Sequence, residues 1–224
     1  MLKEILPNDH ALLTPTHLLP NYQSLETSLI DNLFSSTKAM SLNESAPLYK
    51  TERNKPVAIL MAGGTGAGKS TVLGQLKEAM MIPDRNYLKI NANDFKEQMP
   101  QYQELVKLKD RRAAEVVHEA SSMIAKKCVN RAIEEELSFS YKQDLYYDGT
   151  LSNKKEAISL VERLKTAGYE VIVVGVTIEP EVSYARAETR SEDSGRWVPK
   201  EVMEKNHKGF TLAFEDIANP QILP

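Results

Sequence analysis

The sequence contains a single cysteine, Cys128, and no long run of apolar residues. One thiol excludes an intramolecular disulfide and a zinc site built from several cysteines; we expect it to be buried, in a protein from a reducing compartment. No stretch approaches the roughly 18 apolar residues that a membrane-spanning helix requires, and the N-terminus, Met1-Leu2-Lys3-Glu4, lacks the pattern of a signal peptide. We therefore expect a soluble cytoplasmic protein that does not bind a membrane.

A strong excess of one charge is also absent, because 28 Lys and Arg residues are balanced by 31 Asp and Glu residues, for a formal net charge of -3. This balance predicts no general attraction to nucleic acids, so a site for anions must come from the local placement of charge. Hydrophobic residues make up 42% of the chain and charged residues 26%, which is ordinary for globular proteins and argues against a disordered chain.

The chain divides into two segments of different composition. Residues 1–50 contain four prolines and one stretch, residues 21–38, whose apolar positions follow helical spacing. We interpret residues 1–50 as an N-terminal helical extension that packs on a main domain of residues 51–224; the alternative is a partly mobile tail. The sequence ends at Pro224, soon after the last expected helix, which leaves room for further chain.

From residue 56 onward, segments typical of strands alternate with segments typical of helices. A continuous apolar run at residues 57–61, ending in glycines, is typical of a strand buried on both faces of a parallel sheet. The alternation predicts right-handed β-α-β connections and a three-layer α/β fold with a mostly parallel sheet. The further expected strands are 87–90, 145–147 and 169–177, and the expected helices are 69–80, 111–137, 153–167 and two that have Pro180 and Pro199 in their first turns.

The strongest motif lies between the first expected strand and the helix after it. It matches the complete G-x-x-x-x-G-K-[ST] pattern of a phosphate-binding loop, or P-loop. Glycines let successive backbone N–H groups point into one hollow at a helix N-terminus, where phosphate oxygens bind. The motif predicts nucleotide binding but does not identify a second substrate. Its residues are Gly63, Gly64, Thr65, Gly66, Ala67, Gly68, Lys69 and Ser70, and Thr71 follows them.

Three side chains at the end of this motif have separate expected roles. Lys69 is predicted to bridge the β- and γ-phosphates, which makes it a catalytic residue as well as a binding residue. The Ser70 hydroxyl is predicted to hold Mg²⁺, and Thr71 to approach the α-phosphate. ATP and Mg²⁺ are therefore the expected cofactors.

Polar segments follow the later strands, at the edge of the sheet where the ligands of open α/β folds collect. Asn91 to Pro100 follows the second strand, and Asp148-Gly149-Thr150 follows the third. The remaining segments are His118-Glu119-Ala120-Ser121-Ser122 within the expected long helix, Ser183-Tyr184-Ala185-Arg186, Arg190, and Gly195-Arg196-Trp197-Val198-Pro199.

Together with the P-loop, these segments resemble the zeta toxin family of P-loop kinases over roughly residues 55–210. The series N-x-N-D-F-K, H-E-x-S-S, D-G-T, S-Y-x-R and G-R-x-V-P carries the resemblance. It implies a P-loop kinase domain at residues 51–224. It also implies ATP-dependent phosphorylation of a nucleotide sugar such as UDP-N-acetylglucosamine on a hydroxyl, and an antitoxin protein as a partner.

The resemblance assigns a second group of residues to the acceptor. Asp148 and Thr150 resemble the acid-Gly-Thr segment beside the acceptor, although Asp148 also suits a turn or a helix cap. His118 and Glu119 are adjacent on a helix and face different ways, so only one of them is expected at the acceptor. We expect that residue to be Glu119, with His118 as the alternative.

Two arginines are similar to those that clamp the triphosphate in the family and stabilise transfer. Arg190 is the first, and a solvated helix face shared with Arg186 is its ordinary alternative. Arg196 is the second, and it follows the polar stretch 191–195, which we expect to form a mobile lid. Trp197 is expected to pack at the base of that lid.

The sequence departs from the family pattern at the catalytic base. The family aspartate aligns with Asn93, and Asp94 stands one position later, where its side chain points about 100° away on a helix. Two interpretations of Asp94 follow: a catalytic base after a register change, or the N-cap of a helix in a capping box with Glu97. Asn93 has no basic side chain, so it is expected to bind and orient the acceptor hydroxyl.

The sequence therefore favours an ATP-dependent small-molecule kinase that acts on a hydroxyl of a nucleotide sugar. Two alternatives stay open at this point. One is a kinase of another nucleotide on the same fold, and the other is a nucleotide-binding regulator whose catalysis is weakened, for which Asn93 is the main argument.

Overall fold

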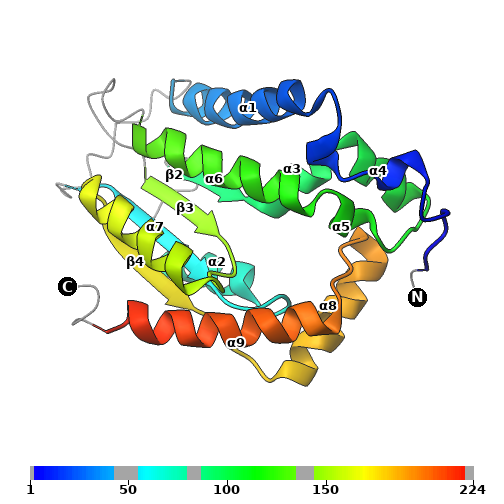
Figure 1. Ribbon diagram of the computed structural model, residues 1–224. Helices are drawn as coiled ribbons and strands as arrows, with labels where there is room; N and C mark the ends of the chain where they lie inside the picture. The colour runs from blue at the N-terminus through cyan, green and yellow to red at the C-terminus, as the bar shows by residue number, and fades with distance from the viewer. Residues whose placement is uncertain (1–2, 43–54, 80–86, 135–143, 220–224) are drawn as a thin grey trace.

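The computed structural model describes residues 3–42, 55–79, 87–134 and 144–219 (Figure 1). Within these residues, four parallel strands form one sheet in the order β2-β3-β1-β4. Each expected strand is present, and the parallel pairing confirms the sequence-based prediction. The strands are β1 Val57–Ala62, β2 Tyr87–Asn91, β3 Asp144–Asp148 and β4 Glu170–Gly175.

Helices connect the strands and cover both faces of the sheet. In Figure 1, α1 and α6 lie above the sheet and α9 runs along the opposite side of the molecule. The helices are α1 Tyr22–Leu42, α2 Lys69–Ala79, α3 Ala92–Gln98, α4 Pro100–Lys107, α5 Ala113–Val116, α6 His118–Glu134, α7 Lys154–Thr166, α8 Pro180–Ser194 and α9 Lys200–Ile217, with short 3-10 turns η1 Ala11–Leu13 and η2 Thr16–Leu18.

Successive side chains of a strand point to opposite faces of the sheet, and this alternation divides the apolar core into two parts. Ala58 and Leu60 of β1 join the apolar cluster that includes residues of α1, α6 and α7. Val57 and Ile59 point the other way and pack with Leu73 of α2. Because successive strand residues face opposite sides, a strand with helices on both faces must be apolar throughout. The expected three-layer α/β fold is confirmed, and all six residues of β1 are buried.

The N-terminal segment packs on this core. Tyr22 and Leu29 of α1 are buried in the same cluster as the sheet. Ion pairs between Glu26 and Lys127, and between Asp31 and Arg131, join α1 to α6. Within residues 3–42, the N-terminal segment thus contacts the core of the domain, and the division into an extension of residues 1–50 and a domain of residues 51–224 stays a prediction. The proposed boundary between residues 50 and 51 lies outside the described residues and stays a prediction.

One buried carboxylate ties the start of the described chain to the domain. Asp110 accepts hydrogen bonds from the backbone N–H groups of Ile5, at 2.9 Å, and Leu6, at 3.0 Å. The Arg112 guanidinium donates to both of its oxygens, at 2.9 and 2.7 Å. These hydrogen bonds, the one from Arg112 above all, hold the pKa of Asp110 well below its usual range and outweigh the opposing effect of burial.

The helix expected over residues 111–137 is wrong as one element. The structure forms α5 and α6 instead, with a turn at Val117, and residues 135–137 lie outside the described part. Val116 and Val117 are 6% and 0% exposed. A straight helix would separate these neighbours by about 100°, whereas the turn buries both side chains in the core. The apolar spacing alone did not reveal this turn.

Residues 191–195, expected to form a mobile lid, are the end of a helix in the structure, and their mobility stays a prediction. Residues 191–194 form the last turn of α8, where the Ser191 side chain is buried and its hydroxyl donates to the Glu188 carbonyl. Gly195 ends the helix with a φ of +66°, a left-handed conformation that favours glycine. Polar composition had suggested a loop, but a helix end with one packed serine has the same composition.

Among the predictions for single residues, those for Gly168, Pro180 and Cys128 are confirmed and that for Pro199 is wrong. Gly168 follows α7 with a φ of +86°, as expected for a residue just past a helix, and Pro180 lies in the first turn of α8. Pro199, in contrast, is the N-cap of α9 and precedes its first turn. Cys128 is buried as expected, and burial raises the pKa of its thiol to about 12.

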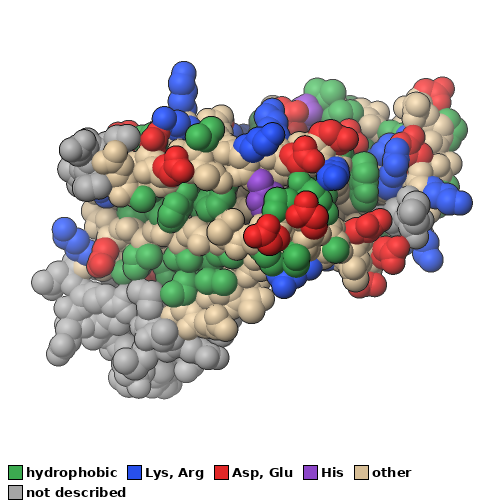
Figure 2. All heavy atoms as spheres, turned by 90° about the horizontal axis from the view of Figure 1, so that it is seen from below, with side chains coloured by type: hydrophobic (Ala, Val, Ile, Leu, Met, Phe, Trp, Pro, Cys, Tyr) green, Lys and Arg blue, Asp and Glu red, His purple; other side chains and the backbone are tan. Residues whose placement is uncertain are grey.

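The surface is mixed in character. Figure 2 views the molecule from the side on which α9 lies, and shows basic and acidic side chains interspersed with hydrophobic ones. Leu212 of α9 is 61% exposed, so part of this apolar surface comes from that helix. Among the described helices, none combines the length and the hydrophobicity needed to cross a lipid bilayer.

We predict that Asp110→Asn destabilises the fold by about 3–5 kcal/mol, because it breaks the pair between the buried Asp110 carboxylate and the Arg112 guanidinium. Chemical denaturation at neutral pH measures this. The folded-state pKa of Asp110 is depressed, so its stabilisation is present above the unfolded-state pKa of about 4 and is lost as the pH falls below that value. The difference between wild type and variant should therefore shrink in acid.

The control is Glu104→Gln, which removes a carboxylate from an exposed pair with Lys107. Exposed pairs contribute about 0–1 kcal/mol, so this variant should stay close to wild type at every pH. A loss in Asp110→Asn no larger than that of the control would contradict the role given to Asp110.

Candidate active site

The phosphate-binding loop lies between the end of β1 and the start of α2. Its backbone needs glycine at two places in particular. Gly66 has a φ of +82°, and a Cβ there would lie 2.4 Å from the Ser183 carbonyl oxygen. Gly63 has a φ of +148°, and a Cβ there would lie 2.3 Å from the Val176 carbonyl oxygen. The glycines of the motif thus allow both the turn and the close approach of neighbouring backbone.

Helices α8 and α9 support this loop from outside. The Ser183 hydroxyl of α8 donates to the Thr65 carbonyl and lies 3.1 Å from Nε2 of His207 on α9. A Cβ on Gly64 would lie 2.5 Å from that same nitrogen. Sequence reasoning missed His207, because a single histidine on an amphipathic helix, about 140 residues after the loop, carries no local signal.

Lys69 points its ammonium group back over the loop. Its Nζ donates to the carbonyl oxygens of Gly63, at 3.0 Å, and Gly64, at 3.2 Å. Burial lowers the pKa of Lys69, the Arg190 charge lowers it further, and Asp148 opposes both. A buried ammonium group held by neutral carbonyls is suited to exchange them for phosphate oxygens. Ser70 and Thr71 follow in the first turn of α2, and both are exposed.

Asp148 and Thr150 lie beside the loop, and the contact with the acceptor expected of them stays a prediction. Asp148 ends β3 and pairs in register with Met61 of β1 and Asn91 of β2. The Asn91 amide donates to its Oδ2 at 3.4 Å. The Gly63 N–H donates to the Thr150 carbonyl at 3.3 Å. The carboxyl ends of three neighbouring strands thus bring these residues to one edge of the sheet.

The charge state of Asp148 reflects this position. Burial raises its pKa, the nearby Lys69 ammonium lowers it, and the Asp94 carboxylate raises it again. Asp148 therefore lies within electrostatic reach of both Lys69 and Asp94, which connects the P-loop to the segment that follows β2.

The interpretation of Asp94 as an N-cap is wrong. Asn91 is the N-cap of α3, and its side-chain oxygen accepts a hydrogen bond from the Asn93 N–H at 2.9 Å. Asp94 lies in the first turn instead, where its carboxylate pairs with the Lys89 ammonium at 2.7 Å. An asparagine directly before the helix satisfies the first N–H groups, so the capping box with Glu97 does not form.

Two guanidinium groups converge from α8 and from the residues after it. Burial lowers the pKa of Arg190, and the neighbouring Arg196 lowers it further. The Nε of Arg190 is buried and has no hydrogen-bond partner among the described residues. Arg196 lies 3.3 Å from the Ser194 hydroxyl and 3.7 Å from a Glu97 oxygen. The solvated face expected as an alternative for Arg190 does not match this burial.

Neighbouring residues hold the arginine segment in place. The Tyr102 hydroxyl donates to the Ser194 carbonyl. The Arg111 guanidinium lies over the Trp197 ring, 4.9 Å from its centroid. Trp197 thus packs against Arg111 next to Arg196, in agreement with the packing role expected for it.

Sequence reasoning placed Glu119 at the acceptor, but the structure does not bring it to the P-loop residues. Its carboxylate is 66% exposed and lies 3.3 Å from His17 of η2. His118 instead places its Nδ1 3.5 Å from Nζ of Lys96 on α3. Lys96 is 9% exposed, and the sequence did not reveal this burial because it arises from packing between distant segments. The acceptor contact of Glu119 stays a prediction.

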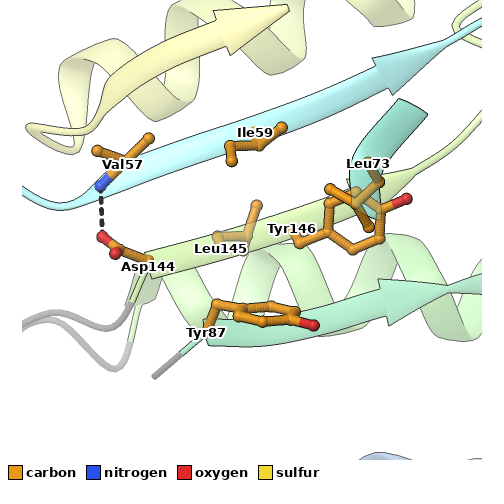
Figure 3. A pocket seen from close by; sticks show the side chains of 7 residues that line it. All are labelled: Val57, Ile59, Leu73, Tyr87, Asp144, Leu145 and Tyr146. Carbon is orange, nitrogen blue, oxygen red and sulfur yellow. Dashed lines mark hydrogen bonds between the residues drawn. The ribbon is translucent and has the colours of Figure 1, made fainter. Parts of the chain in front are cut away.

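A small hollow on the α2 face of the sheet is separate from these residues (Figure 3). It lies at the opposite ends of the strands, where the Val57 N–H donates to Asp144 at 2.7 Å. Tyr87 and Tyr146 contribute an edge-to-face ring pair with centroids 6.2 Å apart. Because its lining is mostly apolar and turned away from the P-loop, this hollow does not form part of the site.

The cationic residues fit a nucleotide with its phosphates. Lys69 and Arg190 are half-buried cations without a carboxylate in ion-pair contact among the described residues, and Gly63, Gly64 and Gly66 of the loop leave no room for a side chain. The role of Ser70 as a ligand of Mg²⁺ stays a prediction. No cluster of three or more potential metal-ligating side chains occurs in the described ranges, and Mg²⁺ bound with nucleotide phosphates does not require one.

The fold and the loop define this chain as a member of the P-loop kinase fold class. More specifically, it belongs to the zeta toxin family, because the family model described as Zeta toxin matches residues 41–224. The expected family is thereby confirmed, and the match includes every residue of the site described above.

Individual relatives agree with this assignment. Toxin PezT of Streptococcus pneumoniae is 28% identical over 163 residues, which cover 73% of this chain and 60% of PezT. A structure of the PezAT toxin-antitoxin system of the same organism matches with a TM-score of 0.54 at 22% identity, over 76% of this chain and 63% of that one. The chain thus spans less than two thirds of these relatives.

A second solved structure resembles the whole of the chain. The crystal structure of AvrRxo1-ORF1:AvrRxo1-ORF2 with sulphate ions matches with a TM-score of 0.64 at 18% identity, over 99% of this chain and 69% of that one. At this identity the likeness concerns the fold, and it includes the N-terminal segment that the family model omits.

We predict that Lys69→Ala weakens the binding of Mg·ATP by at least about tenfold, because hydrogen bonds to charged groups contribute about 1.5–3 kcal/mol. Calorimetry on the folded variant measures this affinity. Lys126→Ala, which removes an exposed lysine paired with Glu156, is the control and should bind as wild type does. Equal affinities of wild type and Lys69→Ala would overturn the P-loop assignment.

Proposed function

We propose that the protein is an ATP-dependent phosphotransferase that transfers the γ-phosphoryl group of Mg·ATP to a hydroxyl of a nucleotide sugar such as UDP-N-acetylglucosamine. The observation that carries this proposal is the convergence of a complete P-loop, two half-buried arginines and the carboxylates of Asp94 and Asp148 at one edge of the sheet. Phosphoryl transfer needs positioning and electrostatic stabilisation of charge, and these groups supply both.

The relatives support this reading. PezT is named a toxin, and the structure that includes it is of a toxin-antitoxin system. A structure of similar fold, with a TM-score of 0.63 at 16% identity, is of AvrRxo1-ORF1:-ORF2 with ATP. We therefore include an antitoxin protein as a proposed partner and ATP with Mg²⁺ as proposed cofactors.

The nucleotide side of the site is assigned as follows. The backbone N–H groups of the P-loop and the Lys69 ammonium bind the phosphates, and the Ser70 hydroxyl holds the metal ion. Mg²⁺ neutralises charge on the phosphates and orients the γ-phosphoryl group when it is bound. Arg190 and Arg196 stabilise the charge that develops on the transferred group.

The acceptor side of the site is formed by residues after β2 and β3. We assign Asp94 as the base that receives the proton of the acceptor hydroxyl. Its carboxylate is 44% exposed, lies near Asp148 and pairs with Lys89, an arrangement that keeps it available to a ligand at this edge. Asn93 orients the hydroxyl, and Asp148 and Thr150 border the acceptor.

The assignment of the catalytic base is tested by substituting the residues at positions 93 and 94. With Asp94 as base, Asp94→Asn should lower the transfer rate by about 10² to 10⁴, the usual contribution of general-base catalysis, without weakening ATP binding. Asn93→Asp should leave the rate near that of wild type. Single-turnover rates with Mg·ATP and UDP-N-acetylglucosamine measure both effects.

The opposite pattern would assign the base to the other position. A faster Asn93→Asp together with an active Asp94→Asn would show that position 93 is the base position and that the native asparagine weakens catalysis. Melting temperatures of both variants serve as the control, because Asp94→Asn removes only an exposed ion pair and should cost no more than about 1 kcal/mol.

We predict that Arg196→Ala lowers turnover by about 10³ or more while ATP affinity changes far less, because the P-loop holds the ground state and Arg196 acts on the transferring group. Arg163→Ala, which removes an exposed arginine that donates to Asn130, is the matched control. Equal losses of turnover and ATP affinity would indicate that Arg196 binds the ground state.

Incubation with labelled ATP and a panel of nucleotide sugars, other nucleotides and free sugars tests the function as a whole. Transfer to UDP-N-acetylglucosamine or a close analogue would support the proposal, and transfer only to another nucleotide would favour a different acceptor. The second candidate, a nucleotide-binding regulator, is favoured by Asn93 at the position of the family aspartate. Tight ATP binding without transfer to any acceptor would support the regulator.

A further inference from the structure

A serine and a histidine from two different helices meet on the outer side of the P-loop. The Ser183 hydroxyl of α8 donates to the Thr65 carbonyl oxygen, and Nε2 of His207 on α9 lies 3.1 Å from the same hydroxyl. Ser183 is 0% exposed, so solvent does not compete for these contacts. A chain of hydrogen-bonding groups thus runs from α9 through α8 to the backbone of the P-loop.

The chemistry of these groups determines the direction of both hydrogen bonds. A carbonyl oxygen only accepts, so the single proton of the Ser183 hydroxyl points at Thr65. That hydroxyl can then only accept from His207, and Nε2 must carry a proton. The imidazolium and the neutral ring with its proton on Nε2 both meet this requirement, whereas the neutral ring with its proton on Nδ1 does not.

The imidazole ring of His207 also lies directly against the loop. A Cβ on Gly64 would lie 2.5 Å from Nε2, 2.7 Å from Cε1 and 2.8 Å from Cδ2 of that ring. At the next glycine of the loop, a Cβ on Gly66 would lie 2.4 Å from the Ser183 carbonyl oxygen. Three consecutive residues of the loop, 64–66, are therefore approached closely by α8 or α9.

The support at Thr65 acts on a peptide unit of the phosphate-binding loop. In a planar trans peptide, the carbonyl and the N–H of the next residue point in opposite directions. Because the Thr65 carbonyl is turned outward to Ser183, the Gly66 N–H is turned away from α8, as binding of phosphate in such a loop requires. Without the His207 donor, the hydroxyl can rotate to the carbonyl one turn earlier in α8, a common alternative for a serine in a helix.

We propose that His207 is a positioning residue for nucleotide binding, which donates from Nε2 to Ser183 and so holds the peptide unit at Thr65 in its phosphate-binding orientation. This inference rests on the proposed function only in that the P-loop binds Mg·ATP, and it does not depend on the acceptor. Helix α9 therefore contributes to nucleotide affinity as well as to the packing of the domain.

The first measurement is the affinity for a non-hydrolysable ATP analogue with Mg²⁺, by calorimetry. His207→Leu removes the donor and should weaken binding by about fivefold or more, the usual scale for a lost hydrogen bond that leaves a buried partner unsatisfied. His207→Gln carries an amide N–H the same number of bonds from Cβ and should stay within about twofold of wild type. Lys208→Leu changes the exposed neighbour on α9 and should bind as wild type does.

The second measurement separates a contact through Ser183 from simple packing of the ring. Ser183→Ala removes the hydroxyl and should weaken binding about as much as His207→Leu does. In the double variant, His207→Leu should add no more than about twofold to the effect of Ser183→Ala, because both substitutions remove the same interaction. Two losses that multiply would show that the ring acts by packing alone and would overturn the proposal. Melting temperatures confirm that each variant is folded.

The third measurement needs no variant. NMR chemical shifts of the ring nitrogens distinguish the tautomers of histidine, and those of His207 should show a proton on Nε2 in the ligand-free protein at neutral pH. A neutral ring with its proton on Nδ1 would contradict the proposal, whether or not His207→Leu folds.

Three further results would also overturn it: unchanged affinity in His207→Leu, a loss in His207→Gln as large as in His207→Leu, or no binding of the analogue to wild type. A protein that binds the analogue with these effects but transfers no phosphoryl group to any acceptor would contradict the proposed function and leave this inference intact. The failures of the two proposals are therefore distinguishable.

Discussion

The position of β1 between two parallel neighbours is the constraint on which the site depends. β1 pairs with β3 on one side and β4 on the other, and helices cover both of its faces. The position of the C-terminal end of β1 is therefore fixed by the two neighbouring strands and by the helices on both faces. The P-loop follows β1 directly, so the position of its first residue is fixed by the sheet. The hydrogen-bond register of β1 with β3 and β4 also fixes the positions of Asp148 and of the residues after β4. Helices α8 and α9 then close the loop through Ser183 and His207.

The charged residues at the carboxyl ends of the strands favour the binding of an anion over the ligand-free state. Lys69, Arg190 and Lys96 all have lowered pKa values, with burial as the leading cause, and each is a charge removed from water without a full set of anionic partners. Such groups destabilise the folded chain slightly by themselves and bind anions strongly. The apolar core on both faces of the sheet offsets that cost. The stability of the domain thus comes from the core, whereas its binding chemistry lies at the carboxyl ends of the strands.

The sequence was sufficient for features defined by local patterns. The strand, glycine loop and helix of the P-loop are contiguous, so residues 57–79 could be predicted almost to the residue. The burial of Lys96 and the contacts of His207 could not, because both arise from packing between distant segments. Polar composition did not reveal that residues 191–194 are the last turn of a helix, and the alternative role of Asp94 as an N-cap failed because Asn91, three residues earlier, is an equally good cap.

The anchoring of the N-terminal segment has a consequence for the arginine end of the site. The Lys3 carbonyl accepts from the Arg111 N–H, and the Arg111 guanidinium stacks on Trp197, the residue next to Arg196. Local opening of a protein proceeds in cooperative units of contacting segments. These contacts join the N-terminal segment and the turn at Asp110 to the residue beside Arg196, the arginine that we propose to act in transfer, so loss of the N-terminal contacts would remove support from that end of the site.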